Sequence, residues 1–525
     1  MSLPRNYDDV PMNWVGDLSG RRATMTPNLE AVCDAVTGKR YTYKEMDDRA
    51  NKLGAYLRDE LKVERGDRVC ILMTNRIEAM DLYFACGKLG YILSPLSYAL
   101  HKSELEDLLN RIQPKVIFYE DIFAELAETW NMPPSVSERV RVGDNEFFYE
   151  GEIMNRPVEK INIPKSMNDT QMYIHTGGTT AMPKICVVPY RQMIWNSFEL
   201  MTNSMIGYTN VEGGYAVMQT FPFFHIGGWN SLIPAYYMGT RVVLLRTFNP
   251  DLAIETIEKE KITTFGAVEA MLQFMYASPK FADADFSSVV AMTTAAAPCS
   301  EAVLQPFWDK GIKSNQAYGL TEAGPSNFMC VLQEGTQEEI KTKASKIGIS
   351  MAHCDYKIID QDTREEVKQG EKGVLCMRSP HSFGGYLNDH WRTEKLFLEG
   401  GWVYTGDLAV EDEEGLVSIV GRADNMFISG GENVSPEEIE QVLKRHPAVA
   451  GAISVGIKDQ KWGEAPVALV VLRPGAKVEE EELIEFCGSQ LARFKIPKQV
   501  KIGQALPLTG AGKLDRNALK AMFEG

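Results

Sequence analysis

Short apolar runs alternate with helical patterns along most of the chain, and this alternation restricts the possible folds more than any other feature. The segment YKEMDDRANKLGAYL, residues 43–57, places Met46, Ala50, Leu53 and Leu57 on one face at helical spacing. The apolar run DRVCILMTN follows it, and similar runs recur as KVIFYE, RVVLLRTF and TTFGAV. Strands that alternate with helices are typical of parallel sheets covered by helices. We therefore predict an α/β fold of layered sheets and helices, with mostly parallel sheets.

The pattern changes within GRADNMFISGGENVSPEEIEQVL, residues 421–443. A glycine-rich turn leads there to Ser435 and Pro436, which suit the N-cap and the first position of a helix. The chain has 525 residues, too many for one ordinary core. We predict a large N-terminal body with subdomains, residues 1–423, and a small α+β C-terminal domain, residues 424–525.

Composition excludes several classes of partner. The net charge is −16, which disfavours nucleic acid and anionic membrane surfaces. No apolar run approaches the length of a membrane-spanning helix, so we expect no integral membrane segment. Nine scattered cysteines without a CxxC pair argue against a zinc site and favour a reducing compartment. The acidic, proline-containing start does not resemble a signal peptide, and we expect a cytoplasmic protein.

The stretch HTGGTTAMPK, residues 175–184, combines glycines, threonine hydroxyls and Lys184. Strand-like sequences on both sides, QMYIHT and KICVVPY, predict a strand–loop–strand unit. A Walker A loop is excluded, because Pro183 precedes the lysine and Ile185 follows it. The loop's N–H groups, hydroxyls and lysine could wrap a polyphosphate. Taken alone, the stretch is equally compatible with a surface turn that carries an incidental lysine.

Five further stretches offer groups suited to a nucleotide site. They are FPFFHIGG with His225, TTAAAPCS at 293–300, QAYGLTEAG with Thr321 and Glu322, GWVYTGDL with Asp407, and LPLTGAGKLDR with Lys513. In this order and spacing they resemble the motif series of the acyl-adenylate-forming (AMP-binding) superfamily, and the tail most resembles fatty-acyl-CoA and aryl-CoA ligases. The resemblance covers nearly the whole chain. The family's phosphate loop falls on residues 177–185, and the chain departs from it at Gly177, Ala181 and Ile185.

The resemblance implies a two-step reaction. A carboxylate attacks the α-phosphorus of ATP to give acyl-AMP and pyrophosphate, and the thiol of CoA then displaces AMP. The first step brings two anions together and needs positive charge and Mg²⁺ rather than a strong base. The residues implied in catalysis are Lys513, His225, Thr321 and Glu322, with Glu322 and Thr180 at the Mg²⁺ ion.

The same resemblance assigns the nucleotide contacts. The phosphate loop supplies Thr176, Gly177, Gly178, Thr179, Thr180 and Lys184, while Ala295, Ala296, Ala297, Pro298, Tyr318 and Gly319 surround adenine. Asp407 is implied to accept both ribose hydroxyls, with Arg422 as the matching contact nearby.

The remaining assignments concern CoA, the acid and domain motion. Gly430, Gly431 and Lys495 are implied on the CoA side, and Asp424 at a hinge about which the small domain rotates between the two steps. Trp229, Val268 and Gly319 are expected to line the acyl pocket, with Trp229 shortening it. The favoured substrate is a medium- or long-chain fatty acid. The alternatives are an aryl acid of benzoate or cinnamate type and, from another class, a non-catalytic nucleotide-binding sensor; a homodimer is one alternative for the assembly.

Overall fold

The computed structural model describes residues 14–176, 183–203, 214–295, 299–331, 337–344, 346–429, 432–459, 462–509 and 514–524. Its contacts divide the chain into two compact units. The first unit is Met1–Asp355 with Arg378–Val403, and the second is Tyr356–Met377 with Tyr404–Gly525. The second unit thus begins before the predicted boundary at Ala423, and a functional hinge at Asp424 stays a prediction.

The first unit contains a six-stranded sheet with the strand order β6-β5-β3-β4-β7-β8. Its strands are β3 (Arg68–Leu72), β4 (Ile92–Pro95), β5 (Val116–Glu120), β6 (Glu138–Val142), β7 (Thr170–Thr176) and β8 (Lys184–Pro189). All neighbours are parallel except β7 and β8, which are antiparallel. The predicted strand–loop–strand unit is therefore the β7–β8 pair at one edge of this sheet.

A nine-stranded sheet in the same unit has the order β15-β14-β13-β12-β11-β9-β10-β1-β2. Its strands are β1 (Glu30–Asp34), β2 (Arg40–Thr42), β9 (Ala216–Gln219), β10 (Arg241–Leu244), β11 (Thr264–Ala267), β12 (Ala291–Thr294), β13 (Lys313–Leu320), β14 (Gly324–Val331) and β15 (Ile349–Ser350). The central strands, from β1 through β13, are parallel, and the outer pairs are antiparallel. The predicted α/β fold with mostly parallel sheets is confirmed.

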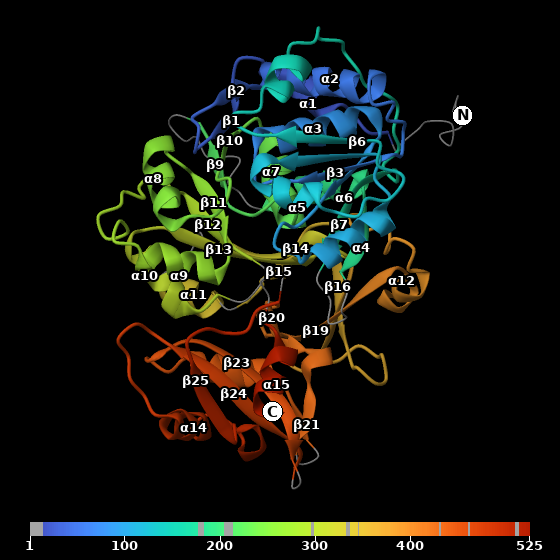
Figure 1. Ribbon diagram of the computed structural model, residues 1–525. Helices are drawn as coiled ribbons and strands as arrows, with labels where there is room; N and C mark the ends of the chain where they lie inside the picture. The colour runs from blue at the N-terminus through green and yellow to red at the C-terminus, as the bar shows by residue number, and fades with distance from the viewer. Residues whose placement is uncertain are drawn as a thin grey trace, which may run out of the picture. The chain divides into compact units, whose positions relative to one another are not determined.

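Helices of the first unit cover these sheets (Figure 1). They are α1 (Leu18–Met25), α2 (Tyr43–Asp59), α3 (Ile77–Leu89), α4 (Lys102–Ile112), α5 (Ala124–Glu128), α6 (Tyr190–Asn203), α7 (Ile226–Met238), α8 (Pro250–Glu260), α9 (Glu269–Ala277), α10 (Glu301–Asp309) and α11 (Gln337–Lys343). The last helix of this unit, α12 (His390–Leu396), packs against Phe397–Leu398 instead. Helix α2 begins with a capping box in which Thr42 and Glu45 each accept the other's backbone N–H. The face predicted from its spacing, Met46 to Leu57, is completely buried, because it packs into the core beside α3.

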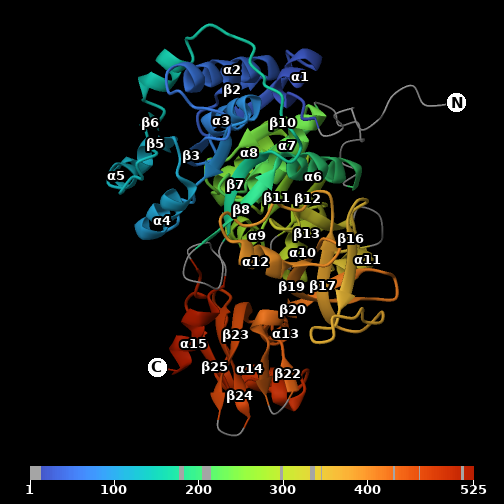
Figure 2. The same cartoon turned by 90° about the vertical axis from the view of Figure 1, so that its right-hand side faces the viewer.

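Two five-stranded sheets are formed mainly by the second unit. The first consists of β16 (Asp355–Ile359), β17 (Gly373–Arg378), β18 (Phe397–Leu398), β19 (Trp402–Glu411) and β20 (Val417–Arg422), although β18 itself belongs to the first unit. The second consists of β21 (Phe427–Ser429), β22 (Glu432–Val434), β23 (Val449–Asp459), β24 (Gly463–Leu472) and β25 (Gln499–Gly503). Helices α13 (Pro436–Lys444), α14 (Glu480–Gly488) and α15 (Arg516–Glu524) pack on this second sheet (Figure 2).

Helix α13 starts where the sequence predicted, with Ser435 at the N-cap and Pro436 in the first turn. The Ser435 hydroxyl does not cap the helix, however. It donates instead to the Glu437 carboxylate at 2.8 Å and to the Val420 carbonyl at 3.3 Å, and so ties α13 to β20.

The structure can be compared with two expectations from the sequence, which concern membrane-spanning helices and the cysteines. Among the described helices, none has both the length and the apolar character required to cross a bilayer. All nine cysteines are buried. Burial raises the pKa of several of these thiols, that of Cys70 to about 12, which keeps them protonated and unreactive.

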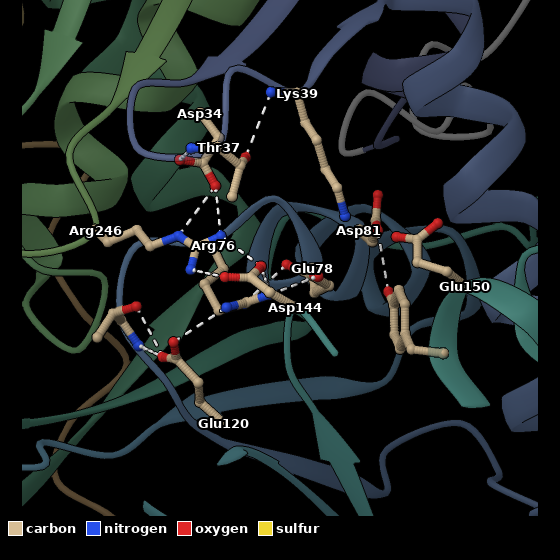
Figure 3. A network of polar contacts seen from close by, with 12 residues as sticks. Asp34, Thr37, Lys39, Arg76, Glu78, Asp81, Glu120, Asp144, Glu150 and Arg246 are labelled. Carbon is tan, nitrogen blue, oxygen red and sulfur yellow. Dashed lines mark hydrogen bonds and ion pairs between the residues drawn. The ribbon is translucent and has the colours of Figure 1, made fainter. Parts of the chain in front are cut away.

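A mostly buried network of charged side chains, in which Asp144 is exposed, joins the two sheets of the first unit (Figure 3). Arg76, which follows β3, contacts Glu120 at the end of β5 at 3.1 Å, Glu78 at 3.0 Å and Asp144 at 3.1 Å. Arg246, which follows β10, contacts the same Asp144 at 2.6 Å and Asp34 at the end of β1 at 2.8 Å. Hydrogen bonds from Arg246 lower the pKa of Asp144 to about 2. The carboxyl ends of strands from both sheets are therefore held together by two guanidinium groups.

Arg76→Met is expected to destabilise the protein by about 3–5 kcal/mol, because Glu78 and Glu120 would remain buried without their cation. The measurement is urea unfolding of the variant and the parent. Arg58→Met is the matched control, since Arg58 pairs with Asp59 and Glu159 in a half-exposed setting and should cost about 0–1 kcal/mol. Equal losses in the two variants would show that the buried network does not hold the sheets.

Candidate functional site

The β7–β8 pair presents two polar side chains next to the predicted phosphate loop. Thr176 ends β7, Lys184 begins β8, and the two residues face each other in the strand register. Both are half-buried. The predicted loop residues Gly177, Gly178, Thr179, Thr180 and Ala181 lie outside the described residues.

Ile185 is not part of that loop. It is the second residue of β8, pairs with His175 and is 1% exposed in a hydrophobic cluster. The family pattern placed Ile185 at the end of the loop; in the structure it belongs to the strand instead, and its side chain fills the core under the sheet.

The turn between β13 and β14 carries Thr321 and Glu322. Two glycines shape it. A Cβ at Gly319 would lie 2.5 Å from the Pro325 carbonyl oxygen, so the strand has no room for a side chain there. Gly324 has φ +111°, and the ring of His381 occupies the space that a side chain would need. Close packing around this turn places Thr321 and Glu322 in one defined conformation.

The main-chain carbonyls of residues 321–323 all accept hydrogen bonds from buried or half-buried groups. The Thr321 carbonyl accepts from Gln192 at 2.6 Å, and the Glu322 carbonyl accepts from the Phe383 N–H at 3.0 Å. Asn327 and Ser379 both donate to the Ala323 carbonyl at 2.9 Å. The turn is thus held from α6, β14 and the segment 379–383, which leaves little freedom to the backbone that carries Glu322.

Tyr386 connects this turn to β8. Its hydroxyl donates to Glu322 Oε1 at 2.7 Å, and the Lys184 ammonium lies 5.2 Å from the centre of its ring. Burial, followed by the Glu322 carboxylate, raises the pKa of Tyr386, so the phenol keeps its proton and remains a donor. A cation and a carboxylate from two different sheets are thereby brought to one side chain.

His225 is the N-cap residue of α7 and is half-buried. The preceding segment is fixed by Asn75, which donates to the Phe221 carbonyl at 3.0 Å and accepts from the Phe223 N–H at 2.9 Å. The same amide donates to the Leu245 carbonyl at 3.1 Å. Asn75 follows β3, so the position of His225 depends on a residue that the motifs did not indicate.

His175 lies next to Thr176 and is buried. Its Nε2 accepts the Ser97 N–H at 3.0 Å. Burial, and after it the positive potentials of His225 and Arg111, lower the pKa of His175 to about 3. The imidazole is therefore neutral at physiological pH and ties the end of β7 to the segment that follows β4.

The predicted adenine and acyl residues are only partly described. Ala295 follows β12 and donates its N–H to the Ala267 carbonyl at 3.3 Å, while Ala296, Ala297 and Pro298 lie outside the described residues. Tyr318 and Gly319 lie half-buried near the end of β13. Val268 caps α9 and is also half-buried.

The surroundings of Trp229 do not match a pocket wall. Its indole is 0% exposed and stacks between Tyr83 and Phe223, with ring centres 4.7 and 4.5 Å away. Its N–H donates to the Phe223 carbonyl at 2.7 Å. We therefore correct the interpretation: Trp229 is a core residue, because its aromatic neighbours cover both faces.

Asp407 and Arg422 come together in the second unit. They face each other across β19 and β20, and Arg422 Nη1 donates to Asp407 Oδ1 at 2.8 Å. Asp407 is buried, whereas Arg422 is half-exposed and also approaches Asp424 at 3.6 Å. Asp424 itself is exposed, in the short 3₁₀ helix Ala423–Asn425.

Lys495, predicted on the CoA side, and Lys498 three residues later both have protein partners in the second unit. Lys495 contacts both oxygens of Glu438 at 2.7 Å, and Lys498 pairs with Asp459. Gly430, Gly431 and Lys513 lie outside the described residues. The segment after Lys513 is anchored by Arg516, which contacts Glu437 at 2.8 Å and also pairs with Glu440.

The sequence was compared with known proteins. The pattern of AMP-binding enzymes matches residues 20–387, and that of the AMP-binding enzyme C-terminal domain matches residues 438–513. The chain belongs to the AMP-binding enzyme family, as its motifs predicted. A feruloyl-CoA synthase of Amycolatopsis sp is 29% identical over 97% of this chain and 99% of its own. A long-chain-fatty-acid–CoA ligase of Mycobacterium tuberculosis is 28% identical over 98% and 99%.

A solved structure supports the same family. The o-succinylbenzoate CoA synthetase of Bacillus subtilis, in complex with an acyl-adenylate intermediate, superposes with a TM-score of 0.82. It is 26% identical and covers 97% of this chain and 99% of its own. The predicted fold class and the family of acid–thiol ligases are both confirmed.

His175→Gln should reduce the acid sensitivity of the protein. Because the folded-state pKa of His175 lies near 3 and the ordinary value near 6.5, its contribution to stability is complete above pH 6.5. That contribution is lost as the pH falls toward 3, by about 1.4 kcal/mol per pH unit. Glutamine can still accept the Ser97 N–H but does not titrate.

The measurement is urea unfolding of parent and variant between neutral pH and pH 4. The parent should lose stability more steeply than the His175 variant as the pH falls. His390→Gln, at an exposed position, is the control and should follow the parent. Identical slopes for parent and His175 variant would contradict a buried neutral imidazole.

Proposed function

We propose that this protein is an ATP-dependent carboxylic acid–CoA ligase. The carboxylate of the acid attacks the α-phosphorus of ATP and expels pyrophosphate, and the CoA thiol then attacks the acyl carbon and expels AMP. The observation that carries the proposal is the convergence of Lys184 and Glu322 on Tyr386 beside the phosphate-loop strands. That arrangement supplies a cation for phosphate oxygens and a carboxylate for a hard metal ion, which a reaction between two anions needs.

The donor set around Glu322 fits Mg²⁺ rather than a resident metal. No cluster of three or more His, Cys, Asp or Glu side chains suited to a metal occurs among the described residues. Mg²⁺ is usually held by one or two carboxylates with phosphates and water, so Glu322 together with Thr180 and ATP would suffice. When bound, Mg²⁺ would offset the negative charge on the phosphates.

The remaining roles extend the proposal to the second unit. We assign Asp407 and Arg422 to the ribose of ATP, Gly430, Gly431 and Lys495 to CoA, and Asp424 to a hinge. Lys495 would have to exchange its contact with Glu438 for a CoA phosphate. A cytoplasmic location and a homodimeric assembly belong to the proposal as well.

The acid is proposed to have an apolar body, and a medium- or long-chain fatty acid is the first candidate. A specific cluster favours an aryl acid as the second candidate. Asn230 on α7 donates to the Ser326 hydroxyl at 2.9 Å, and the Ser326 N–H donates to Asn196 on α6 at 3.0 Å. Ser326 lies four residues beyond Glu322. Ser326 and Asn196 are buried, whereas Asn230 is half-buried, so Asn230 is the member of this cluster that could bind a ring substituent. The names of the feruloyl-CoA synthase and the o-succinylbenzoate CoA synthetase agree with an aryl acid.

A panel of acids tests the function and separates the two candidates. Fatty acids of graded length and benzoate and cinnamate types, each with and without a ring hydroxyl, are scored for CoA-dependent AMP formation. A hydroxylated aryl acid preferred by about tenfold or more over its parent ring would select the second candidate. Pyrophosphate release without any thiol-dependent step would leave an adenylating enzyme, and no pyrophosphate release with any acid would overturn the proposed function.

Lys513→Ala is expected to lower pyrophosphate release by about 10²–10³, because a cation that stabilises transferring oxygens is worth about 3–4 kcal/mol. The same variant, given synthetic acyl-AMP and CoA, should form thioester at nearly the parent rate, since the second step uses other groups of the second unit. Lys477→Ala, at an exposed lysine of the same unit, is the control and should change neither rate. Equal loss of both steps in the Lys513 variant would exclude separate roles for the two half-reactions.

A further inference from the structure

Tyr386 contacts two residues that no single element of secondary structure brings together. Its hydroxyl donates to Glu322 Oε1 at 2.7 Å, and its ring lies under the Lys184 ammonium at 5.2 Å. Lys184 starts β8 of the six-stranded sheet, whereas Glu322 follows β13 of the nine-stranded sheet. Among the described residues, Lys184 and Glu322 do not form an ion pair with each other. Tyr386 is therefore the residue that contacts both of these charged side chains.

The backbone around Tyr386 is firmly held. Residues 384–387 run along β8: the Val187 N–H donates to the Gly385 carbonyl and the Leu387 N–H donates to the Ile185 carbonyl, each at 2.9 Å. The Tyr386 N–H donates to Thr393 at 2.9 Å. The side chain is 7% exposed and packs against Phe383 and Cys186. Because the Tyr386 side chain is held in one position, it can restrict the positions of the Glu322 carboxylate and the Lys184 ammonium, which it contacts.

We propose that Tyr386 is a positioning residue that sets both the metal-binding carboxylate and the phosphate-binding lysine of the site. This inference rests on the proposed function. One hydrogen bond orients the Glu322 carboxylate through a single oxygen, as groups behind metal ligands commonly do. The ring attracts the Lys184 ammonium without cancelling its charge, which a carboxylate partner would do. Tyr386 thus keeps the lysine and the glutamate close but unpaired, ready for an anion and a cation respectively.

Two substitutions separate the two contacts. Tyr386→Phe removes the hydroxyl and keeps the ring, whereas Tyr386→Leu removes both. ATP binding is measured by calorimetry on the full-length protein without acid, first in EDTA and then at rising free Mg²⁺. The Phe variant should need about tenfold more Mg²⁺ for half-maximal enhancement of ATP binding, with affinity in EDTA unchanged. The Leu variant should in addition bind ATP about three- to fivefold more weakly in EDTA, through loss of the cation–π contact.

A double-mutant cycle tests whether Tyr386 acts through Glu322. Tyr386→Phe should not shift the Mg²⁺ response further in a Glu322→Gln background, because the oriented carboxylate is already absent. Tyr356→Phe is the matched control: its hydroxyl donates to Glu411 at 3.1 Å in the other unit and should leave the Mg²⁺ response unchanged. The melting temperature of each variant is also measured. A melting temperature like that of the parent shows that a changed Mg²⁺ response does not come from loss of the fold.

The possible outcomes test three statements separately: the role of Tyr386 toward Glu322, its role toward Lys184, and the proposed function. An unchanged Mg²⁺ response in the Phe variant, or additive effects in the cycle, would overturn the role of Tyr386 toward Glu322. A Leu variant that binds ATP in EDTA as the Phe variant does would overturn its role toward Lys184. A parent protein that binds ATP equally with and without Mg²⁺, or not at all, would overturn the proposed function, and this inference would fail with it.

Discussion

The contacts of Arg76 and Arg246 with Glu78 at the start of α3 and with the acidic residues at or just beyond the ends of β1, β5 and β6 are the constraint on which the rest of the first unit depends. The candidate site takes Lys184 from one sheet and Glu322 from the other, so the sheets must keep a constant relation. Buried guanidinium groups suit this purpose because they need several acceptors at set angles. Asn75, one residue before Arg76, extends the same junction to the segment that carries His225.

The site itself depends on close backbone packing as much as on its charged groups. Gly319 and Gly324 admit no side chain, and four donors hold the carbonyls of the Thr321–Ala323 turn. A turn held in this way is preorganised, and preorganised dipoles stabilise charge at low cost. In the role proposed for it, Tyr386 aligns Lys184 and Glu322, the two side chains proposed to meet the ligand. Neutral partners, such as His175 and Tyr386, surround the site, so its charges stay available for the substrates.

The motifs indicated Lys184 and Glu322, which the structure brings to one side chain, but they misplaced two apolar residues. Trp229 and Ile185 stand beside motif residues in the chain, yet both side chains point into the core. Neighbouring residues point to opposite faces of a strand and about 100° apart around a helix, so closeness to a motif does not place a side chain in the site. Tyr386, Asn75 and Arg516 went unnoticed for the opposite reason. They lie far along the chain from the groups they hold, and only a glycine pair before Tyr386 hinted at an unusual backbone.

The sequence by itself determined the alternation of helices and strands, the buried face of α2, the start of α13 and the membership of the AMP-binding enzyme family. These features depend on local periodicity, capping residues and short motifs, which can be read from the order of residues along the chain. Only the tertiary structure decided which strands share a sheet, that residues 356–377 join the C-terminal unit, and that Tyr386 meets both Lys184 and Glu322. Those outcomes depend on contacts between residues distant in the chain. Burial and hydrogen bonding together determine which of these distant residues come into contact, and no local sequence pattern predicts such contacts.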